Sequence, residues 1–299
     1  RISFGIQDFN HDVQVAVNRV QPVELVEKIL TPDIRARFKS INFDILWGLP
    51  KQTRETFGET VKTLQHFSPD KITLLHYGHY PDVYKHQSLI NGADIPLYSE
   101  QNLMNIEAVL KLEDCGYEMV GLDHLAKQDH ELVKWKKEKR LNRSFIGYSG
   151  KIPNLLGLGP SGLSSIRSNT YAQNSYGLPD YFKAVKEKRF PVFRGYVPDQ
   201  DLIIRGDVIN TLINYKELSF SEIETKYEIN FKGYFRKELD SLGALIDDGV
   251  IEFSDHGIKA SSLGRFFVRH ACMAFDRFLW EGESHKPTSK KDSRLKVTA

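Results

Sequence analysis

The chain has 299 residues, of which 40% are apolar and 27% charged, and its formal net charge at pH 7 is +2. This composition is ordinary for a soluble globular protein, and the length is enough for two domains of roughly 100–200 residues each. So small a net charge produces no strong electrostatic attraction to nucleic acid or to an anionic membrane surface. No run approaches the roughly 18 apolar residues of a membrane-spanning helix. We therefore expect no nucleic-acid and no membrane partner.

Residues 1–125 alternate between strand and helix patterns. Strands are predicted at residues 1–6, 41–47, 71–77 and 117–122, with helices at residues 55–67 and 99–115 among the connections. The first of these helices places Phe57, Val61 and Leu64 on one face, at i, i+4 and i+7. Strands separated by helices imply right-handed βαβ units and a parallel sheet. Such a sheet, if it curls, forms part of a TIM-like barrel, so the expected fold class is α/β.

Residues 126–200 are predicted to be a loop-rich connecting region. Residues 126–145 are basic and polar, which favours a solvated helix face over a polyanion site. Residues 146–180 are rich in Gly, Ser and Asn and are typical of loops. The string from Gly157 to Gly162 matches G-x-G-x-x-G, but it contains Pro160 and no clear strand precedes it. These features argue against a dinucleotide site and favour a glycine loop that brings backbone close to a ligand.

Residues 201–282 are predicted to form a mostly helical, winged-helix-like domain. Three helices, at residues 202–215, 221–227 and 231–246, precede a hairpin of residues 250–253 and 257–260, and a last amphipathic helix covers residues 262–280. The basic tail at 283–299 lacks apolar periodicity and is expected to be disordered. DNA binding is the alternative that this pattern raises. The third helix mixes Lys232 and Arg236 with Glu238 and Asp240, whereas a helix facing phosphates is more uniformly basic. We therefore expect this domain to serve as a lid over the mouth of the predicted barrel instead of binding DNA.

Polar side chains follow the predicted strands, where TIM-like barrels place their functional groups. Gln7 and Asp8 follow the first strand, while Asn42 and Asp44 share one face of the second. Polar side chains at alternate positions of a strand covered on both faces are costly unless they bind something. Asp44 can accept from a ribose hydroxyl or an ammonium group. The alternative is a structural aspartate that holds a neighbouring loop.

Three further positions have two interpretations each. Gly78 closes the third strand, where a glycine either permits close approach of a ligand or marks a bulge. Arg19 is either a bidentate fork for a carboxylate or a surface arginine. Asp123 and His124 form either an acid–base pair or a structural pair. Each alternative stays open on the sequence alone.

The chain has two cysteines, Cys115 and Cys272. Two thiols exclude a disulfide scaffold and favour a reducing, cytoplasmic location. Both side chains are expected to be small buried groups that serve in packing.

Together, the motifs resemble those of oxygen-independent coproporphyrinogen III oxidases (coproporphyrinogen dehydrogenases), a radical S-adenosylmethionine family, up to about residue 282. Their order is Gln7-Asp8-Phe9-Asn10, Asn18-Arg19, Asp44, Gly48-Leu-Pro-Lys-Gln-Thr53, His79-Tyr-Pro81, Asp123-His124, Gly147-Tyr148 and Cys272-Met273. Heme chaperones of the same superfamily are the nearest confounder. They have Ser at the position of Asp8, Gly at that of Lys51, and Glu-x-Gly-Thr in place of His79-Tyr-Pro-Asp82, so the oxidases are favoured.

The resemblance implies an activity. Such enzymes convert two propionates of coproporphyrinogen III to vinyl groups, giving protoporphyrinogen IX, by a 5′-deoxyadenosyl radical made from S-adenosylmethionine at a [4Fe–4S] cluster. It also implies an electron donor and two S-adenosylmethionine molecules per active site. The positions that match its contact pattern are Gln7, Arg19, Asp44, Gly78 and Leu163. We further expect a monomer.

One departure from the family pattern concerns the cluster. The family's Cys-x3-Cys-x2-Cys loop would lie before Arg1, and two cysteines are fewer than the three or four thiolates that a [4Fe–4S] cluster needs. We therefore expect the C-terminal half of a radical SAM partial barrel plus its helical domain, with no cluster and no turnover of its own. The alternatives are a non-catalytic heme or porphyrin carrier of the same superfamily and a winged-helix regulator fused to a degenerate barrel.

Overall fold

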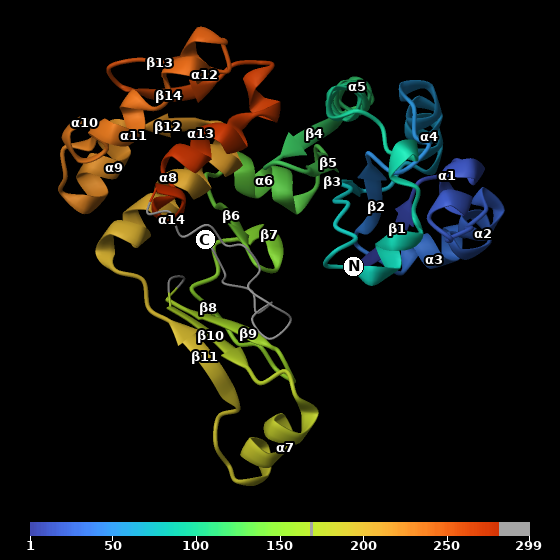
Figure 1. Ribbon diagram of the computed structural model, residues 1–299, viewed down its shortest axis with the longest axis horizontal. Coiled ribbons are helices and arrows are strands. Elements are labelled where there is room, and N and C mark those ends of the chain that lie inside the picture. Colours follow the sequence, from blue (N-terminus) through green and yellow to red (C-terminus); the bar gives the residue numbers. More distant parts are fainter. Residues whose placement is uncertain (168–169, 281–299) are drawn as a thin grey trace. The chain divides into compact units, whose positions relative to one another are not determined.

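The computed structural model describes residues 1–167 and 170–280 of the chain (Figure 1). The chain divides into two compact units, Arg1–Glu138 and Lys139–Ala299. The sequence predicted the first boundary near residue 125. The first unit continues beyond it because β5 (His124–Lys127) joins its sheet and α6 (Glu131–Lys137) packs on β4 (Tyr117–Val120) and β5. The predicted tail at residues 283–299 lies outside the described residues.

The first unit contains a five-stranded sheet in the order β1-β2-β3-β5-β4. β1 (Ile2–Gln7), β2 (Ile41–Trp47) and β3 (Lys71–His76) are parallel, which confirms the prediction for the first three strands. The prediction for the fourth strand is wrong in its pairing. β4 is separated from β3 by β5, which is antiparallel to both. The sequence missed β5 because it follows β4 after only three residues, so the two strands form a hairpin instead of a βαβ unit.

The first unit also contains helices. They are α1 (His11–Ala16), α2 (Val23–Ile29), α3 (Pro32–Ala36), α4 (Arg54–Phe67), α5 (Tyr98–Asp114) and α6, with short 3₁₀ turns at Lys85–Leu89 and Gly92–Asp94. Of these, α5 packs on β2 and β4, and α6 packs on β4 and β5. α4 begins with a capping box made by Thr53 and Thr56. Its predicted apolar stripe is confirmed, because Phe57, Val61 and Leu64 are all buried. Burial of each such side chain contributes about 1.5–3 kcal/mol to folding.

The second unit begins with two antiparallel sheets. β6 (Leu141–Ser144) and β7 (Gly147–Gly150) form a hairpin. β8 (Asn154–Leu155), β9 (Leu163–Ile166), β10 (Thr170–Asn174) and β11 (Val192–Tyr196) form a four-stranded sheet in the order β11-β10-β9-β8, with α7 (Leu178–Lys186) between β10 and β11. The prediction of loops at residues 146–180 is therefore wrong. Low strand propensity is overridden here by cross-strand pairing and by side chains that hold the loops, such as Asn174, which donates to the carbonyls of Gly157 and Gly159.

The rest of the second unit is mostly helical. Its elements are α8 (Gln200–Tyr215), β12 (Glu217–Ser219), α9 (Phe220–Tyr227), α10 (Phe231–Tyr234), α11 (Arg236–Asp240), α12 (Gly243–Asp247), β13 (Ile251–Phe253), β14 (Gly257–Ala260), a 3₁₀ turn at Gly264–Phe266, α13 (Val268–Ala274) and α14 (Arg277–Trp280). The helix predicted at residues 231–246 is three short helices. The predicted hairpin gains β12 as a third strand, paired with β14. The last predicted helix is interrupted after Ala274, where Asp276 turns the chain and its carboxylate accepts from the Phe278 N–H.

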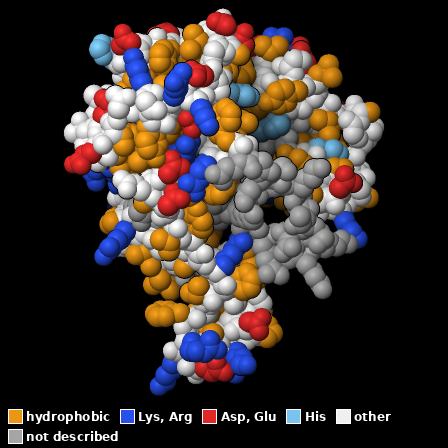
Figure 2. Space-filling view, turned by 60° about the vertical axis from the view of Figure 1, so that its left-hand side comes forward, with side chains coloured by type: hydrophobic (Ala, Val, Ile, Leu, Met, Phe, Trp, Pro, Cys, Tyr) orange, Lys and Arg blue, Asp and Glu red, His pale blue; other side chains and the backbone are white. Residues whose placement is uncertain are grey.

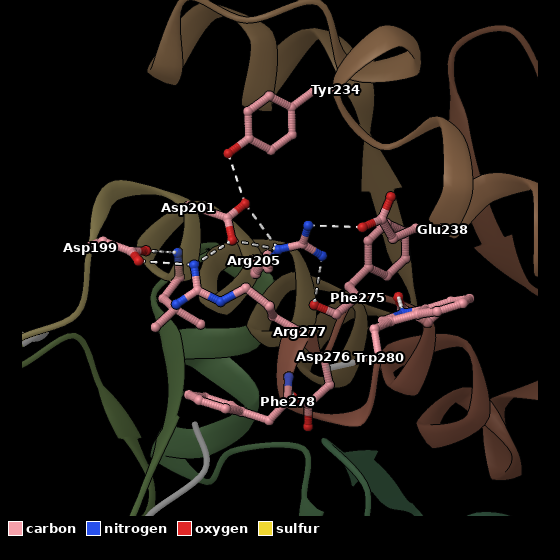
Figure 3. A network of polar contacts seen from close by, with 12 residues as sticks. Asp199, Asp201, Arg205, Tyr234, Glu238, Phe275, Asp276, Arg277, Phe278 and Trp280 are labelled. Atoms are coloured by element: carbon pink, nitrogen blue, oxygen red, sulfur yellow. Dashed lines mark hydrogen bonds and ion pairs between the residues drawn. The ribbon is translucent and has the colours of Figure 1, made fainter. Parts of the chain in front are cut away.

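A polar network fixes α14 to α8 (Figure 3). Arg205 donates from Nε to both oxygens of Asp201 at 2.9 Å, from Nη2 to Glu238 at 2.8 Å and from Nη1 to the Phe275 carbonyl at 3.3 Å. Arg277 donates to Asp201 at 3.0 Å. The C-terminal helices are thus held by charge-assisted hydrogen bonds as well as by packing.

Hydrophobic side chains remain exposed on α7 and β11. Leu178 and Phe182 of α7, Phe190 just after it, and Phe193 of β11 are all exposed, Phe190 to 88%. Figure 2 shows hydrophobic side chains over this part of the unit, in the lower part of the view. The sheet that contains Leu163 therefore presents both apolar surface and, as described below, a cationic side chain.

Candidate functional site

One face of the parallel strands in the first unit is polar. The register sets Ser3 of β1 beside Asn42 of β2, and Asp44 of β2 beside Thr73 of β3. The intervening residues of β2, which are Ile41, Phe43 and Ile45, are fully buried against the helices. The prediction that Asn42 and Asp44 lie on the face opposite these apolar residues is confirmed.

Hydrogen bonds connect the polar side chains of this face. Thr73 Oγ1 donates to Asn42 Oδ1 at 3.0 Å, and Asn42 Nδ2 donates to both Ser3 Oγ and Asp44 Oδ1 at 2.7 Å. Ser3 Oγ in turn donates to Asp44 Oδ2 at 2.7 Å. Asn42 and Thr73 are buried, whereas Asp44 is partly exposed. A carboxylate has about four lone-pair positions, so Asp44 is oriented by the protein and still has acceptor capacity for a ligand.

Gln7 and Arg19 lie next to Asp44. Arg19 Nη2 donates to the carbonyl oxygen of Gly5 at 2.9 Å, and Gly5 is the residue paired with Asp44 in the register. Gln7 ends β1 with a left-handed backbone, φ 70°, at an irregularity of the β1–β2 pairing. The structure therefore brings Gln7, Arg19 and Asp44 together at one end of the sheet. Arg19 is exposed, but its guanidinium is anchored to the strand.

Asp8 has a structural role that the sequence did not reveal. Its carboxylate, only 1% exposed, accepts from Gln52 Nε2, from Thr60 Oγ1 at 2.7 Å and from the Asn10 N–H at 2.6 Å. Burial raises the pKa of Asp8, against the opposing effect of these hydrogen bonds. Gln52 also accepts from the Leu49 N–H. Asp8 thus joins the loop after β1 to the loop after β2, and Gln52, inside the Gly48–Thr53 motif, was the available signal.

Gly78 lies beyond the end of β3, in a turn that Gln87 holds. Gln87 Nε2 donates to the Gly78 carbonyl at 3.0 Å, and its Oε1 accepts from the Tyr80 N–H at 2.6 Å. A Cβ on Gly78 would lie 2.5 Å from Cε2 of Tyr80. Close approach of the Tyr80 ring therefore accounts for the glycine, and its backbone lies at the same end of the parallel strands as Gln7.

The Asp123–His124 pair lies on the polar face as well. His124 Nδ1 is 2.7 Å from Asp123 Oδ1, and His124 is paired with Thr73 in the register of β3 and β5. Both side chains are mostly buried. The pair belongs to the same row of the sheet as Asp44, a position that the sequence did not predict because it missed β5.

Leu163 belongs to the second unit, whereas the other four predicted contact residues belong to the first. It begins β9 and is paired with Gln173 of β10. The glycine loop packs against it, because a Cβ on Gly157 would lie 2.4 Å from the Leu163 carbonyl oxygen. Close packing on the chain's own strand therefore accounts for the glycine at position 157, and the approach of this loop to a ligand stays a prediction.

The two cysteines do not fit an iron–sulfur cluster. Cys115 is exposed at the end of α5, contrary to the expectation of burial, and Cys272 is buried in α13 of the other unit. Burial raises the pKa of the Cys272 thiol to about 12, which disfavours the thiolate that iron needs. Within residues 1–167 and 170–280, no three His, Cys, Asp or Glu side chains gather as metal ligands.

The polar face around Asp44 suits S-adenosylmethionine better than it suits an iron–sulfur cluster. Its ammonium group and ribose hydroxyls are donors, and Asp44 is an oriented carboxylate with acceptor capacity left. Gln7 and Arg19 add an amide and a guanidinium nearby.

In the described part of the chain, no helix has the length and apolar character needed to cross a membrane.

Comparison with known proteins gives a consistent set of relatives. The oxygen-independent coproporphyrinogen III oxidase of Escherichia coli is 37% identical over 282 residues, covering 93% of this chain and 61% of the relative. That of Helicobacter pylori is 35% identical over 287 residues, covering 95% of the chain and 62% of the relative. That of Thermostichus vulcanus is 30% identical over 282 residues, covering 93% of the chain and 86% of the relative.

A solved structure agrees with these relatives. The coproporphyrinogen III oxidase of Escherichia coli, described as a radical SAM enzyme, matches with a TM-score of 0.85 at 37% identity, over 92% of this chain and 64% of that one. No family model matches the sequence. The chain spans about three fifths of the length of the Escherichia coli and Helicobacter pylori relatives. The α/β fold is thus shared with a radical SAM enzyme.

Proposed function

Because the chain belongs to the family of oxygen-independent coproporphyrinogen III oxidases, we propose that it serves in the oxygen-independent conversion of coproporphyrinogen III to protoporphyrinogen IX. Two propionates of the substrate are decarboxylated to vinyl groups in this reaction. The observation that carries the proposal is the carboxylate of Asp44, which the protein orients and which still has acceptor positions for a ligand. Gln7 and Arg19 lie beside it, and the chain belongs to this enzyme family. The protein works in the cytoplasm as a monomer and takes its electrons from a separate donor.

The residues of this chain bind and orient S-adenosylmethionine. When bound, S-adenosylmethionine would supply the hydrogen-abstracting radical for the propionate β-carbon, with one electron from the separate donor passing through the cluster. Asp44 accepts from the ammonium group or a ribose hydroxyl, and Arg19 donates to a carboxylate. Gln7 contributes its amide and Gly78 its backbone, while Leu163 provides apolar contact. Two S-adenosylmethionine molecules bind per active site. No residue of this chain is assigned to the cluster, which the described residues do not fit.

The two units have different tasks in this proposal. The five-stranded sheet of the first unit is part of a partial barrel whose inner face is the polar face around Asp44. The helical region from Gln200 to Trp280, with its three-stranded sheet, is a winged-helix-like domain.

Turnover is best tested in a chimera. The chain replaces the 282-residue stretch of the Escherichia coli relative to which it aligns, so that the rest of that enzyme is present. We expect the anaerobically prepared chimera to release protoporphyrinogen IX from coproporphyrinogen III when it is given S-adenosylmethionine and a reductant. A folded chimera that carries its cluster and binds porphyrin but leaves the propionates intact would contradict the proposal and favour a porphyrin carrier.

A further inference from the structure

A row of three side chains crosses the four-stranded sheet of the second unit. Leu163 of β9 is paired with Gln173 of β10, and Gln173 is paired with Arg194 of β11. Residues directly opposite each other in antiparallel strands point to the same face. The position that matches the family's S-adenosylmethionine contact, Leu163, therefore shares its face of the sheet with an arginine.

Hydrogen bonds hold the Arg194 guanidinium in one orientation. Arg194 Nε donates to Gln173 Oε1 at 2.8 Å, and the Tyr176 hydroxyl donates to the same oxygen at 2.8 Å. Gln173, which is only 5% exposed, uses its Nε2 to donate to the Ser161 carbonyl at 3.2 Å. The guanidinium carbon lies 6.0 Å from the centre of the Tyr176 ring. The side chain is thus positioned before any ligand arrives, which lowers the entropic cost of binding.

One nitrogen of this guanidinium has no hydrogen-bond partner among the described residues. Nη2 of Arg194 is buried, and no acceptor among the described residues is within hydrogen-bond distance of it. No described carboxylate forms an ion pair with Arg194. Arg205, in the same unit, is the opposite case, because each of its three nitrogens has an acceptor. Arg194 as a whole is half-buried, but a buried guanidinium nitrogen without an acceptor is costly, and the planar fork of the guanidinium matches the two oxygens of a carboxylate.

We propose that Arg194 binds a carboxylate of a small-molecule ligand, with Gln173 and Tyr176 as positioning residues. This inference rests on the proposed function, which supplies two sources of the same chemistry. One is a propionate of coproporphyrinogen III, and the other is the amino-acid carboxylate of S-adenosylmethionine. Either ligand places a carboxylate near an apolar contact, which Leu163 provides in the same row.

The test measures binding to the whole 299-residue chain by fluorescence and calorimetry. The probes are coproporphyrin III, the stable oxidised form of the substrate, and S-adenosylmethionine. Each has a counterpart without the carboxylate, namely coproporphyrin III tetramethyl ester in the same solvent mixture and decarboxylated S-adenosylmethionine. We expect R194Q to weaken binding of one of the two acids roughly tenfold or more, as befits loss of a charge-assisted hydrogen bond, while its counterpart binds as before.

Two further variants make the result specific. R194K keeps the charge without the planar fork and should retain part of the affinity. R189Q makes the same change at an exposed arginine that pairs with Glu187, and should change nothing. The probe whose affinity falls identifies the source of the carboxylate.

Three results would overturn the inference. Unchanged binding of both acids by R194Q would remove it and leave the proposed function intact. Equal losses for the acids and their counterparts would assign Arg194 a purely structural role. If the unsubstituted chain bound neither probe, the inference and the proposed role of this chain would fail together.

Discussion

Two aspartates, one in each unit, organise polar networks that differ in how completely they are satisfied. Asp201 accepts four hydrogen bonds, two from Arg205 and one each from Tyr234 and Arg277. Asp44 accepts two among the described residues, from Ser3 and Asn42. A carboxylate has about four acceptor positions. The carboxylate of Asp201 is therefore saturated, meaning that protein donors fill all of these positions, and that of Asp44 is unsaturated in the same sense.

The difference separates a structural network from a candidate binding network. The Asp201 network joins α8, α10, α11 and α14 and leaves no capacity for a ligand (Figure 3). The Asp44 network provides one hydrogen bond to each oxygen of its carboxylate. Incomplete satisfaction of oriented polar groups is therefore the feature that distinguishes the site, and Arg194 shows the same feature with the opposite charge.

The largest expected effect is loss of stability in the saturated network. R205M removes the partner of Glu238, which is 7% exposed, and of Asp201. Removing one member of a buried ion pair costs about 3–5 kcal/mol, because the other charge stays buried without compensation. Urea unfolding of the whole chain measures this change. K139M, which removes an exposed pair with Glu222, should cost less than about 1 kcal/mol. Similar losses in the two variants would show that the Arg205 network is not structural.

An intermediate effect, on binding instead of stability, is expected in the unsaturated network. D44N keeps an acceptor for Asn42, and the Ser3 hydroxyl can rotate to accept from the new amide, so unfolding should change by less than about 1 kcal/mol. Affinity for S-adenosylmethionine should fall roughly tenfold or more, because the neutral amide makes weaker hydrogen bonds than a carboxylate. Calorimetric titration measures this affinity. A large loss of stability with unchanged affinity would make Asp44 purely structural.

The smallest effect is a pH dependence in the first unit that involves neither network. His130 caps α6: its Nδ1 accepts from the Leu132 N–H, and its Nε2 lies 3.0 Å from Ser40 Oγ. Burial lowers the pKa of His130 below its ordinary 6.5, against the opposing effect of Glu131. Because the folded-state pKa is the lower one, the stability it contributes is present above pH 6.5 and is lost as the pH falls through the folded value.

The measurement is the urea midpoint of the first unit's transition at pH 7.5 and at pH 5. The midpoint of the unsubstituted chain should fall between these values of pH. H130N keeps a side-chain acceptor for the helix N-terminus and removes the titrating group, so its midpoint should fall less. An identical fall in both proteins would assign the acid sensitivity to other groups.

The sequence predicted what depends on local pattern. Alternation along residues 41–47 placed Asn42 and Asp44 opposite Ile41, Phe43 and Ile45, and helical spacing placed Phe57, Val61 and Leu64 in the core. The motif order identified the family that the relatives confirm. These inferences succeed because side-chain direction follows from the periodicity of a strand or a helix.

Only the tertiary structure decided the pairings and the satisfaction of polar groups. β5 was missed because it follows β4 after only three residues, and β7 to β10 were missed because strands rich in Gly, Ser and Asn are stabilised by their neighbours more than by their own propensity. The role of Asp8, the saturation of Asp201 and the unpaired Nη2 of Arg194 depend on residues far apart in the sequence. The chain by itself determined which residues are polar and which face they share. Folding determined which of them have acceptors and donors to spare, because a hydrogen bond depends on distance in space.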